Sequence, residues 1–477
     1  MSPTAMSRAA RATPRVAPPA ARRTSAGRAS PARVARASAR ASASSLDAST
    51  SRVGVASTSS RVRDGAYAWR GHRVHFERGG CDPAVATKHV VFLHGFGVGT
   101  FHYERQLDHL GALVDAETND FNDATANANT NATTCVWALD FVGQGASWPC
   151  DDESASFPYV DEESAAPKGF RYSVDTWRDQ VLYFLTEIVQ PGPAGAYLAG
   201  NSLGGYVAAL VAATEILSET PREEESYNET TDSRKKKSKR RLVHGLVLLN
   251  ATPFWAFVPS DQTSFARKLT PWDGKTPAPF WIQKPFESYW DAFRSEANVK
   301  GLLSLVYGDG KKMVDDTLVR DIIAPTDRKP ALTAFCSVVF SPKSEINFDD
   351  ATRVIRDDKQ KMPVALVYGR DDPWVVPLWG QRMKRAVPRA TYYELPGVGH
   401  CPAHEAPEET NVCVAAFVRR CEATDVDVAD ESLVGEKSIE SAFASGDAAA
   451  RFLVDGAPRN VFEKLAAWRE TRTVAGA

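Results

Sequence analysis

The sequence predicts a domain of the α/β class, built around a mostly parallel β-sheet with helices on both faces. Two observations support this prediction. Short apolar or β-branched runs recur along the chain, and the segments between them have mostly helical character. Strands that alternate with helices form parallel sheets, because each crossover lays a helix on one face. The composition is 43% hydrophobic and 10% aromatic, which allows a large core and excludes a wholly disordered protein.

The predicted strands follow one another at regular intervals. The first begins near Tyr67, where Val74 and Phe76 alternate with polar residues as in a half-buried strand. The others are the runs at residues 88–95, 135–140, 196–201, 245–250, 363–369 and 391–395. No apolar run approaches the roughly 18 residues that cross a bilayer, so the sequence predicts no membrane-spanning helix.

The start of the chain differs in composition from the rest. Residues 1–46 contain nine Arg and no Asp or Glu, and they are rich in Ser and Ala. The remainder carries 48 basic and 59 acidic residues, a net charge of −11, against −2 for the whole chain. This composition predicts an organellar transit peptide and linker over residues 1–60 and a folded domain over 61–422. It does not separate chloroplast from mitochondrion, and a disordered basic arm that binds nucleic acid is the alternative.

Polar stretches interrupt the alternation of strands and helices. Residues 114–134 are mostly Asn, Asp, Thr and Ala, and residues 218–241 run from acidic to basic. Both are predicted to be surface insertions, since a longer loop costs little entropy. The basic run has the alternative of a nucleic-acid patch, but we favour a solvated loop and no nucleic-acid partner. Residues 423–477 form an acidic, Ala-rich tail, for which we predict no role.

The cysteines do not form a recognisable framework. The chain has seven of them, an odd number, and their spacing is not that of metal ligands. We therefore predict free thiols in a reducing compartment and no metal site.

The first chemical signal lies between a predicted strand and a predicted helix. Gly200, Ser202 and Gly204 form the pattern G-x-S-x-G. Small residues on both sides of a serine allow a sharp turn that exposes its hydroxyl above the sheet. The pattern therefore predicts a nucleophile elbow at Ser202. A Gly-rich turn that packs closely against neighbouring backbone is the structural alternative.

A serine hydroxyl needs a base to take its proton and an acid to orient that base. Asp371 and Asp372 come directly after the strand at 363–369, and His400 lies in a Gly-rich loop after the strand at 391–395. We prefer Asp372 over Asp371, and either could simply be part of an acidic turn. His404 is expected to be a surface group or to support the site from outside. The chain order Ser, Asp, His is that of the α/β-hydrolase fold.

Ester hydrolysis also needs backbone N–H groups that point at the developing oxyanion. The strand at 88–95 ends at His94-Gly95, and Phe96 follows at the first strand-to-helix crossing. We predict that the N–H of Phe96 and that of Leu203, the residue after the nucleophile, form the oxyanion hole. Such a reaction needs no metal and no organic cofactor.

Long strings of sequence resemble the pheophytinases, the α/β-hydrolases that remove phytol from pheophytin in chlorophyll breakdown. The strings are HGFGVGTFHYERQL, DFVGQGASWP, VDTWRDQVLYF, GNSLGGYVAAL, LLNATPFWAF, YGRDDPWVVPLWG and GHCPAHEAPE, spread over residues 91–408. The resemblance implies a nucleophile at Ser202, a base at His400, an orienting acid at Asp372 and pheophytin a as substrate. It also implies a chloroplast location, in the stroma or at the thylakoid, and peripheral contacts with the thylakoid or with pigment-catabolic proteins. His94 departs from the proline expected in plant members.

The stretch at residues 252–345 lies where this fold carries a lid after its sixth strand. It contains several Trp and Phe residues that could enclose a prenyl chain or a flat macrocycle, although we expect most of them to build the core of the lid. Another plastid esterase of this fold, acting on chlorophyll or a lipid, would share every catalytic residue. An epoxide hydrolase or dehalogenase would need an acid in place of Ser202. A non-catalytic scaffold is disfavoured by the complete Ser, Asp and His set.

Overall fold

The computed structural model describes residues 63–116, 133–150, 166–219, 241–253, 272–308, 313–423 and 453–454. They form a ten-stranded sheet in the order β1-β2-β4-β3-β6-β7-β8-β9-β10, with β5 paired to β2. The strands are β1 (Arg63–Trp69), β2 (His72–Gly80), β3 (Lys88–Leu93), β4 (Thr134–Leu139), β5 (Trp148–Pro149), β6 (Ala196–Asn201), β7 (Val243–Leu249), β8 (Val364–Gly369), β9 (Thr391–Leu395) and β10 (Leu453–Val454).

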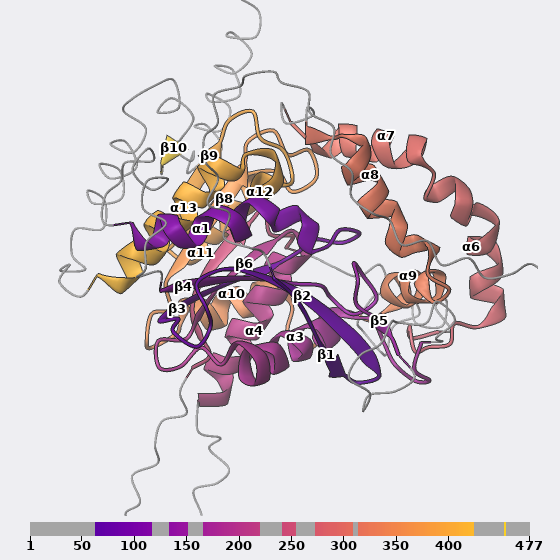
Figure 1. The fold of residues 1–477 in the computed structure, drawn as a ribbon, viewed down its shortest axis with the longest axis horizontal. Helices are drawn as coiled ribbons and strands as arrows, with labels where there is room; N and C mark the ends of the chain where they lie inside the picture. The colour runs from indigo at the N-terminus through magenta and orange to yellow at the C-terminus, as the bar shows by residue number, and fades with distance from the viewer. Residues whose placement is uncertain are drawn as a thin grey trace, which may run out of the picture. The chain divides into compact units, whose positions relative to one another are not determined.

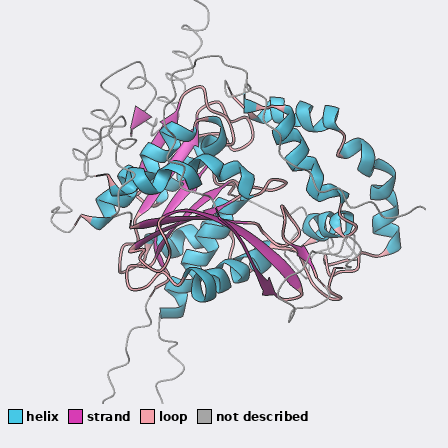
Figure 2. Ribbon diagram, viewed as in Figure 1, coloured by secondary structure: helices cyan, strands magenta, loops and turns pink. Residues whose placement is uncertain are grey.

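The centre of the sheet is parallel and its edges are antiparallel. Strands β4, β3, β6, β7, β8 and β9 pair in parallel. The hairpin β1–β2 adds to β4 at one edge, and β10 adds to β9 at the other, both antiparallel. The predicted α/β class with a mostly parallel sheet is confirmed (Figures 1 and 2).

Helices cover both faces of this sheet, as Figure 1 shows. On one side lie α1 (Glu104–Asp115) and α13 (Pro407–Glu422), and on the other lie α3 (Val174–Tyr183), α4 (Leu203–Glu219) and α10 (Phe348–Arg356). The remaining elements are η1 (Thr100–Tyr103), η2 (Phe184–Val189), α6 (Phe280–Phe293), α7 (Glu296–Val306), α8 (Asp316–Ile323), η5 (Ala324–Asp327), α9 (Ala331–Phe340), α11 (Leu378–Ala386) and α12 (Pro402–Glu405). No helix among the described residues is long and apolar enough to span a bilayer.

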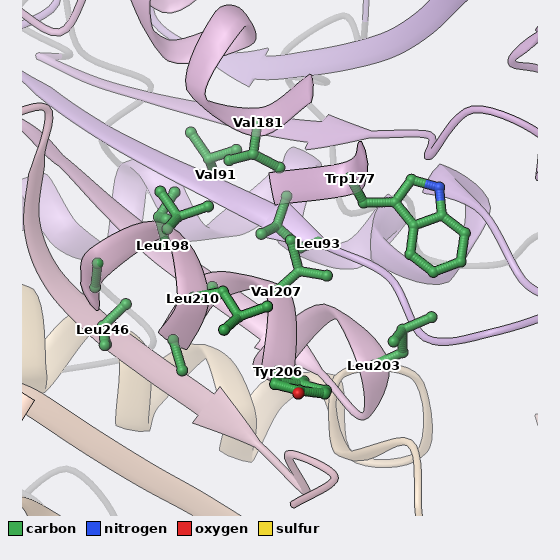
Figure 3. Packing of buried hydrophobic residues seen from close by; sticks show 14 of the residues in the cluster. Val91, Leu93, Trp177, Val181, Leu198, Leu203, Tyr206, Val207, Leu210 and Leu246 are labelled. Atoms are coloured by element: carbon green, nitrogen blue, oxygen red, sulfur yellow. The ribbon is translucent and has the colours of Figure 1, made fainter. Parts of the chain in front are cut away.

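The alternation of side chains along β3 explains the two layers. Val90 and Phe92 belong to the core on the side of α1 and α13, whereas Val91 and Leu93 belong to the core on the side of α3 and α4. Successive side chains of a strand point to opposite faces, so a strand buried on both sides must be apolar throughout. Figure 3 shows the second of these cores, in which Val91 and Leu93 lie among side chains of α3, α4 and β6.

A helical segment separates β7 from β8. We use this name for residues 280–308 and 313–340, which comprise α6, α7, α8, η5 and α9. The sequence predicts that most aromatic side chains of this stretch build its own core, but several of them are exposed. Trp272, just before the segment, is buried, but Phe280, Trp281 and Phe293 are exposed. Whether the stretch 252–345 acts as a lid stays a prediction.

The predicted insertions, leader and tail overlap the described residues only in part. The insertion at 114–134 overlaps the end of α1 and the start of β4, and its residues 117–132 lie outside the described residues. The insertion at 218–241 begins within α4, which extends to Glu219, and residues 220–240 are likewise outside. Residues 1–62 and most of the tail at 423–477 also lie outside the described residues. Within the tail, Leu453 and Val454 form β10, which pairs with β9. All seven cysteines are free.

Candidate active site

Ser202 lies at the turn between β6 and α4 in a backbone conformation that side chains rarely adopt. Its φ is 52°. This left-handed conformation is costly for a residue with a Cβ, and such strain is concentrated at functional sites. The Ser202 N–H donates to Leu249 O at 2.9 Å, and its carbonyl accepts the N–H of Gly205, Tyr206 and Thr252. The turn that the sequence predicted as a nucleophile elbow is therefore held by its backbone at both ends.

The glycines of the elbow are required by close backbone contacts. A Cβ added to Gly204 would lie 2.0 Å from Leu93 O, and one added to Gly200 would lie 2.3 Å from Gly204 O. A Cβ at Gly95 would lie 3.3 Å from the Cβ of Ser202. The elbow thus packs directly against the end of β3 and the residues that follow it. A side chain at Gly204 would push α4 away from β3, and one at Gly200 would push the end of β6 away from the start of α4.

Asp372 and His400 are brought together at the carboxyl ends of β8 and β9. His400 Nδ1 lies 2.7 Å from Asp372 Oδ2, and both side chains are buried. Burial alone would raise the pKa of Asp372, but hydrogen bonds from His400 and from the N–H groups of Val375 and Trp374 lower it below its usual value. The carboxylate is therefore ionised and can only accept, so the proton of His400 sits on Nδ1 and leaves Nε2 as a proton acceptor.

Ser202 is linked to His400 through its neighbour Asn201. The Nδ2 of Asn201 donates to His400 O at 2.9 Å and to Leu249 O at 3.0 Å. The hydroxyl of Ser202 has no hydrogen bond to His400 in the described part of the structure. Nucleophile and base commonly reach hydrogen-bond distance only when substrate is bound, so this geometry is compatible with the predicted roles.

The two acidic residues after β8 have different surroundings. Asp371 is exposed, and its N–H donates to Val398 O at 2.9 Å. Asp372 is 3% exposed and reaches His400. The structure therefore brings the preferred candidate, Asp372, to the imidazole, and leaves Asp371 at the surface.

The loop that carries Phe96 is tied to the loop after β4 by three hydrogen bonds. Phe141 N–H donates to His94 Nε2 at 3.0 Å, Gly97 N–H to a side-chain oxygen of Gln144 at 2.9 Å, and Thr100 N–H to Asp140 at 2.8 Å. These bonds fix the path of the chain on both sides of Phe96 and Gly95. Leu203, the other predicted oxyanion residue, is fully buried at the start of α4.

His94 has a defined protonation state, which follows from its two partners. A backbone N–H can only donate, so Nε2 must accept from Phe141, and the remaining ring proton on Nδ1 donates to Gly95 O at 2.6 Å. Burial lowers the pKa of His94, which favours this neutral form despite the proximity of Asp140. Gly95 O belongs to the same peptide group as Phe96 N–H. The imidazole of His94 therefore orients the peptide that carries the first predicted oxyanion donor.

A family comparison covers the whole of this site. The model of the alpha/beta hydrolase family matches residues 90–411, which include all seven predicted site residues. The chain belongs to this family. Its fold is the α/β-hydrolase fold that the order of Ser, Asp and His had predicted.

Individual known proteins are similar to this chain at sequence identities of 14% to 35%. "Pheophytinase, chloroplastic" of Arabidopsis thaliana is 35% identical over 365 residues, which cover 73% of this chain and 65% of that protein, just under two thirds of its length. Among solved structures, a loop variant of haloalkane dehalogenase from Bradyrhizobium elkanii has a TM-score of 0.47 at 16% identity, covering 76% of this chain and 98% of its own. A putative lipase from Acinetobacter baumannii has a TM-score of 0.45 at 14% identity, covering 76% and 92%.

Sequence reasoning missed two amides of this candidate site, Asn201 and Asn250. Asn250 is fully buried after β7; its Nδ2 donates to Asp372 Oδ2 at 2.6 Å, and its oxygen accepts Gly369 N–H at 2.8 Å. Each amide comes directly at the end of an apolar parallel strand, which is a signal that could have found it. His404 is also more enclosed than expected, since it is half-buried against His102 and Tyr307.

One group of side chains elsewhere has the composition of a metal site. Ligand atoms of Asp64, His75 and Glu77, on β1 and β2, lie within 4.8 Å of one another. His75 also shares a 2.8 Å hydrogen bond with the buried carboxylate of Asp140, and the neighbouring acids raise its pKa although burial opposes this. The raised pKa favours the protonated, cationic form of His75 among these carboxyl groups.

Proposed function

We propose that this chain is a serine carboxylic-ester hydrolase that removes phytol from pheophytin a to give pheophorbide a. The observation that carries the proposal is the buried hydrogen bond between Asp372 and His400 at the same edge of the sheet as the strained turn at Ser202. A histidine oriented by a carboxylate, together with a serine on a strained turn between strand and helix, is the arrangement that activates serine for acyl transfer.

The mechanism follows from the roles of these groups. Ser202 attacks the carbonyl carbon of the ester while His400 Nε2 takes the hydroxyl proton, and the N–H groups of Phe96 and Leu203 stabilise the oxyanion. His400 then gives its proton to the departing phytol. Water, activated by the same imidazole, attacks the acyl-enzyme and releases the acid. The reaction consumes one water for each ester and requires no metal and no organic cofactor.

The pigment substrate is supported by similarity and by one exposed aromatic residue near His400. The similarity is that to the Arabidopsis pheophytinase. The feature is Trp374, whose side chain is 54% exposed although its ring lies 5.7 Å from that of His400. A large exposed aromatic surface beside a catalytic base suits an apolar, flat substrate better than a small polar ester.

The test is incubation of the full chain with pheophytin a, chlorophyll a and a plain long-chain ester, each followed by chromatography, with Ser202→Ala as the inactive control. We expect pheophorbide a and phytol from pheophytin a, with kcat/KM at least about tenfold above that for chlorophyll a. Such a ratio needs only about 1.4 kcal/mol between the two transition states. Equal rates on both pigments would favour a general dephytylase. Activity on the plain ester alone would refute the pigment substrate and leave the triad in place.

The proposed location is the chloroplast, in the stroma or at the thylakoid. It is supported by the Arg-rich, acid-free composition of residues 1–46 and by the chloroplast named for the Arabidopsis relative. Residues 1–60 fused to a fluorescent protein should carry it into plastids. Fluorescence in mitochondria, the nucleus or the cytosol would contradict this location, and mitochondrial fluorescence would also argue against a pigment substrate.

A further inference from the structure

The backbone of His400 is held by hydrogen bonds on every side. Its N–H donates to Val306 O at 2.8 Å, and its carbonyl accepts from Asn201 at 2.9 Å. The N–H on the other edge of that peptide group belongs to Cys401, and it donates to Glu405 Oε1 at 2.8 Å. The position of the imidazole therefore depends on groups from α7, β6 and α12.

Glu405 accepts three backbone hydrogen bonds around the loop of His400. Its second oxygen, Oε2, accepts the N–H of Gly399 at 2.9 Å and the N–H of Gly308 at 2.8 Å. One carboxylate thus binds peptide N–H groups on both sides of His400 and a third in the helical segment. In the described part of the chain no Lys or Arg pairs with Glu405, so these three N–H groups are what match its charge.

The helical segment and the loop of His400 also meet backbone against backbone. A Cβ added to Gly399 would lie 2.2 Å from Val306 O and 2.5 Å from Gly308 N, and one added to Gly308 would lie 2.6 Å from Gly397 O. The side chain of Cys401 packs in a small core with Val306 and Tyr307 of the same segment. The end of α7 is therefore joined to the loop of His400 through hydrogen bonds, glycine contacts and apolar packing.

We propose that Glu405 is a positioning residue that holds His400 in place and couples it to the helical segment at Gly308. This inference rests on the proposed role of His400 as the base. An acceptor-only group is needed, because all three partners are donors. Release of Gly308 from Glu405, by movement of the helical segment, frees one of the contacts that fix the loop of the base. A catalytic group displaced by about 1 Å can lose about a hundredfold in rate, so this coupling would make hydrolysis depend on the docked segment.

The test compares Glu405→Gln with Glu408→Gln in the full chain. Glutamine keeps the shape but offers one oxygen, so its NH2 group must face Cys401 N–H or the N–H pair of Gly308 and Gly399. Glu408 is exposed on α13 and makes the same change of charge three residues away. With 4-nitrophenyl butyrate as the probe, we expect Glu405→Gln to lower kcat by about 10- to 100-fold and KM to stay within about twofold, while Glu408→Gln behaves as the native chain.

A second measurement does not depend on activity. The proton in the hydrogen bond between His400 Nδ1 and Asp372 gives a downfield proton resonance, which Glu405→Gln should shift or broaden and Glu408→Gln should leave unchanged. A folded Glu405→Gln protein with kcat within twofold of native and an unchanged resonance would overturn the proposal. If the native chain hydrolyses no ester, the proposed function fails, and the resonance still decides whether Glu405 positions His400.

A variant with a shorter side chain is used if Glu405→Gln does not fold. Glu405→Asp keeps the charge and both acceptor oxygens but withdraws them from the peptide N–H groups. An intermediate loss of kcat, with faster hydrogen exchange at the amides of Gly308 and Gly399, would support the coupling. Native kcat together with native exchange at these amides would refute it.

Discussion

Replacement of Asp372 by Asn removes half of the acceptors that four donors require. Oδ1 of Asp372 accepts the N–H groups of Trp374 at 2.8 Å and Val375 at 3.0 Å, and Oδ2 accepts Asn250 Nδ2 at 2.6 Å and His400 Nδ1 at 2.7 Å. An amide supplies one oxygen and one NH2 group. In either orientation of the amide, two of the four donors face the NH2 group.

The magnitude follows from the donors left without a partner. A buried donor without a partner costs about 1–3 kcal/mol, and one or two donors are lost according to whether His400 can accept from the NH2 group, so Asp372→Asn should lower the free energy of unfolding by about 1–6 kcal/mol. If the NH2 group faces His400, the imidazole must accept on Nδ1 and carry its proton on Nε2, where it cannot take a proton from Ser202. We expect kcat to fall by about 10⁴-fold, as when the acid of a Ser-His-Asp triad becomes an amide.

The neighbouring acid provides a matched control for this prediction. Asp371→Asn makes the same change one residue away, at an exposed side chain. It should change the free energy of unfolding by no more than about 0.5 kcal/mol and leave kcat within about twofold. Urea unfolding and steady-state hydrolysis of 4-nitrophenyl butyrate measure both quantities. A larger loss of kcat in Asp371→Asn than in Asp372→Asn would refute the reasoning.

Three further predictions concern the surroundings of the site and the core. His94→Ala leaves Phe141 N–H without its acceptor and frees the peptide of Phe96. The value of kcat should therefore fall at least about tenfold, and by no more than the about 10²–10³-fold that loss of an oxyanion donor costs. An unchanged kcat would contradict the role of His94. Gly204→Ala places a Cβ against Leu93 O and should lower stability by about 1–3 kcal/mol or more, which an unchanged thermal midpoint would disprove. Burial lowers the pKa of His72 to about 4, although its hydrogen bond to a backbone carbonyl opposes this. Unfolding therefore takes up a proton at this residue below about pH 6.5, and His72 alone contributes about 2 kcal/mol to the loss of stability from pH 7 to pH 5. His72→Gln should lose about 2 kcal/mol less than the native chain over the same interval, and an equal loss would show that His72 does not titrate on unfolding.

The strands were predictable because buried parallel strands leave a strong local pattern. The runs at 196–201 and 391–395 coincide with β6 and β9, and the others agree with β3, β4, β7 and β8 to within two residues at each end. The hairpin of β1 and β2 was predicted as a single strand. Residues 63–69 contain Arg, Asp and Gly and lack a clear alternation, and their pairing with β2 comes from the fold rather than from their own sequence.

The residues of the candidate site were predictable only in part. Ser202 and His400 stand in patterns that have a mechanical reason, whereas Asp371 and Asp372 differ only in burial, which the fold decides. Asn250 was missed as a site residue because its partner Asp372 lies 122 residues away along the chain, and the link from Glu405 to Gly308 was missed because these two residues lie 97 residues apart. The exposure of Phe280 and Trp281 was also unpredictable, since an aromatic residue in a helical stretch has the same local pattern in a core as on a surface.

The central claim is that Ser202 is a nucleophile activated by His400. The most direct measurement is mass spectrometry of the full chain after reaction with a fluorophosphonate, followed by digestion to locate the adduct. The account predicts one adduct, on the peptide that contains Ser202, with no adduct in Ser202→Ala and a strongly slowed reaction in His400→Ala. An unlabelled native chain, or an equal adduct in Ser202→Ala, would contradict it.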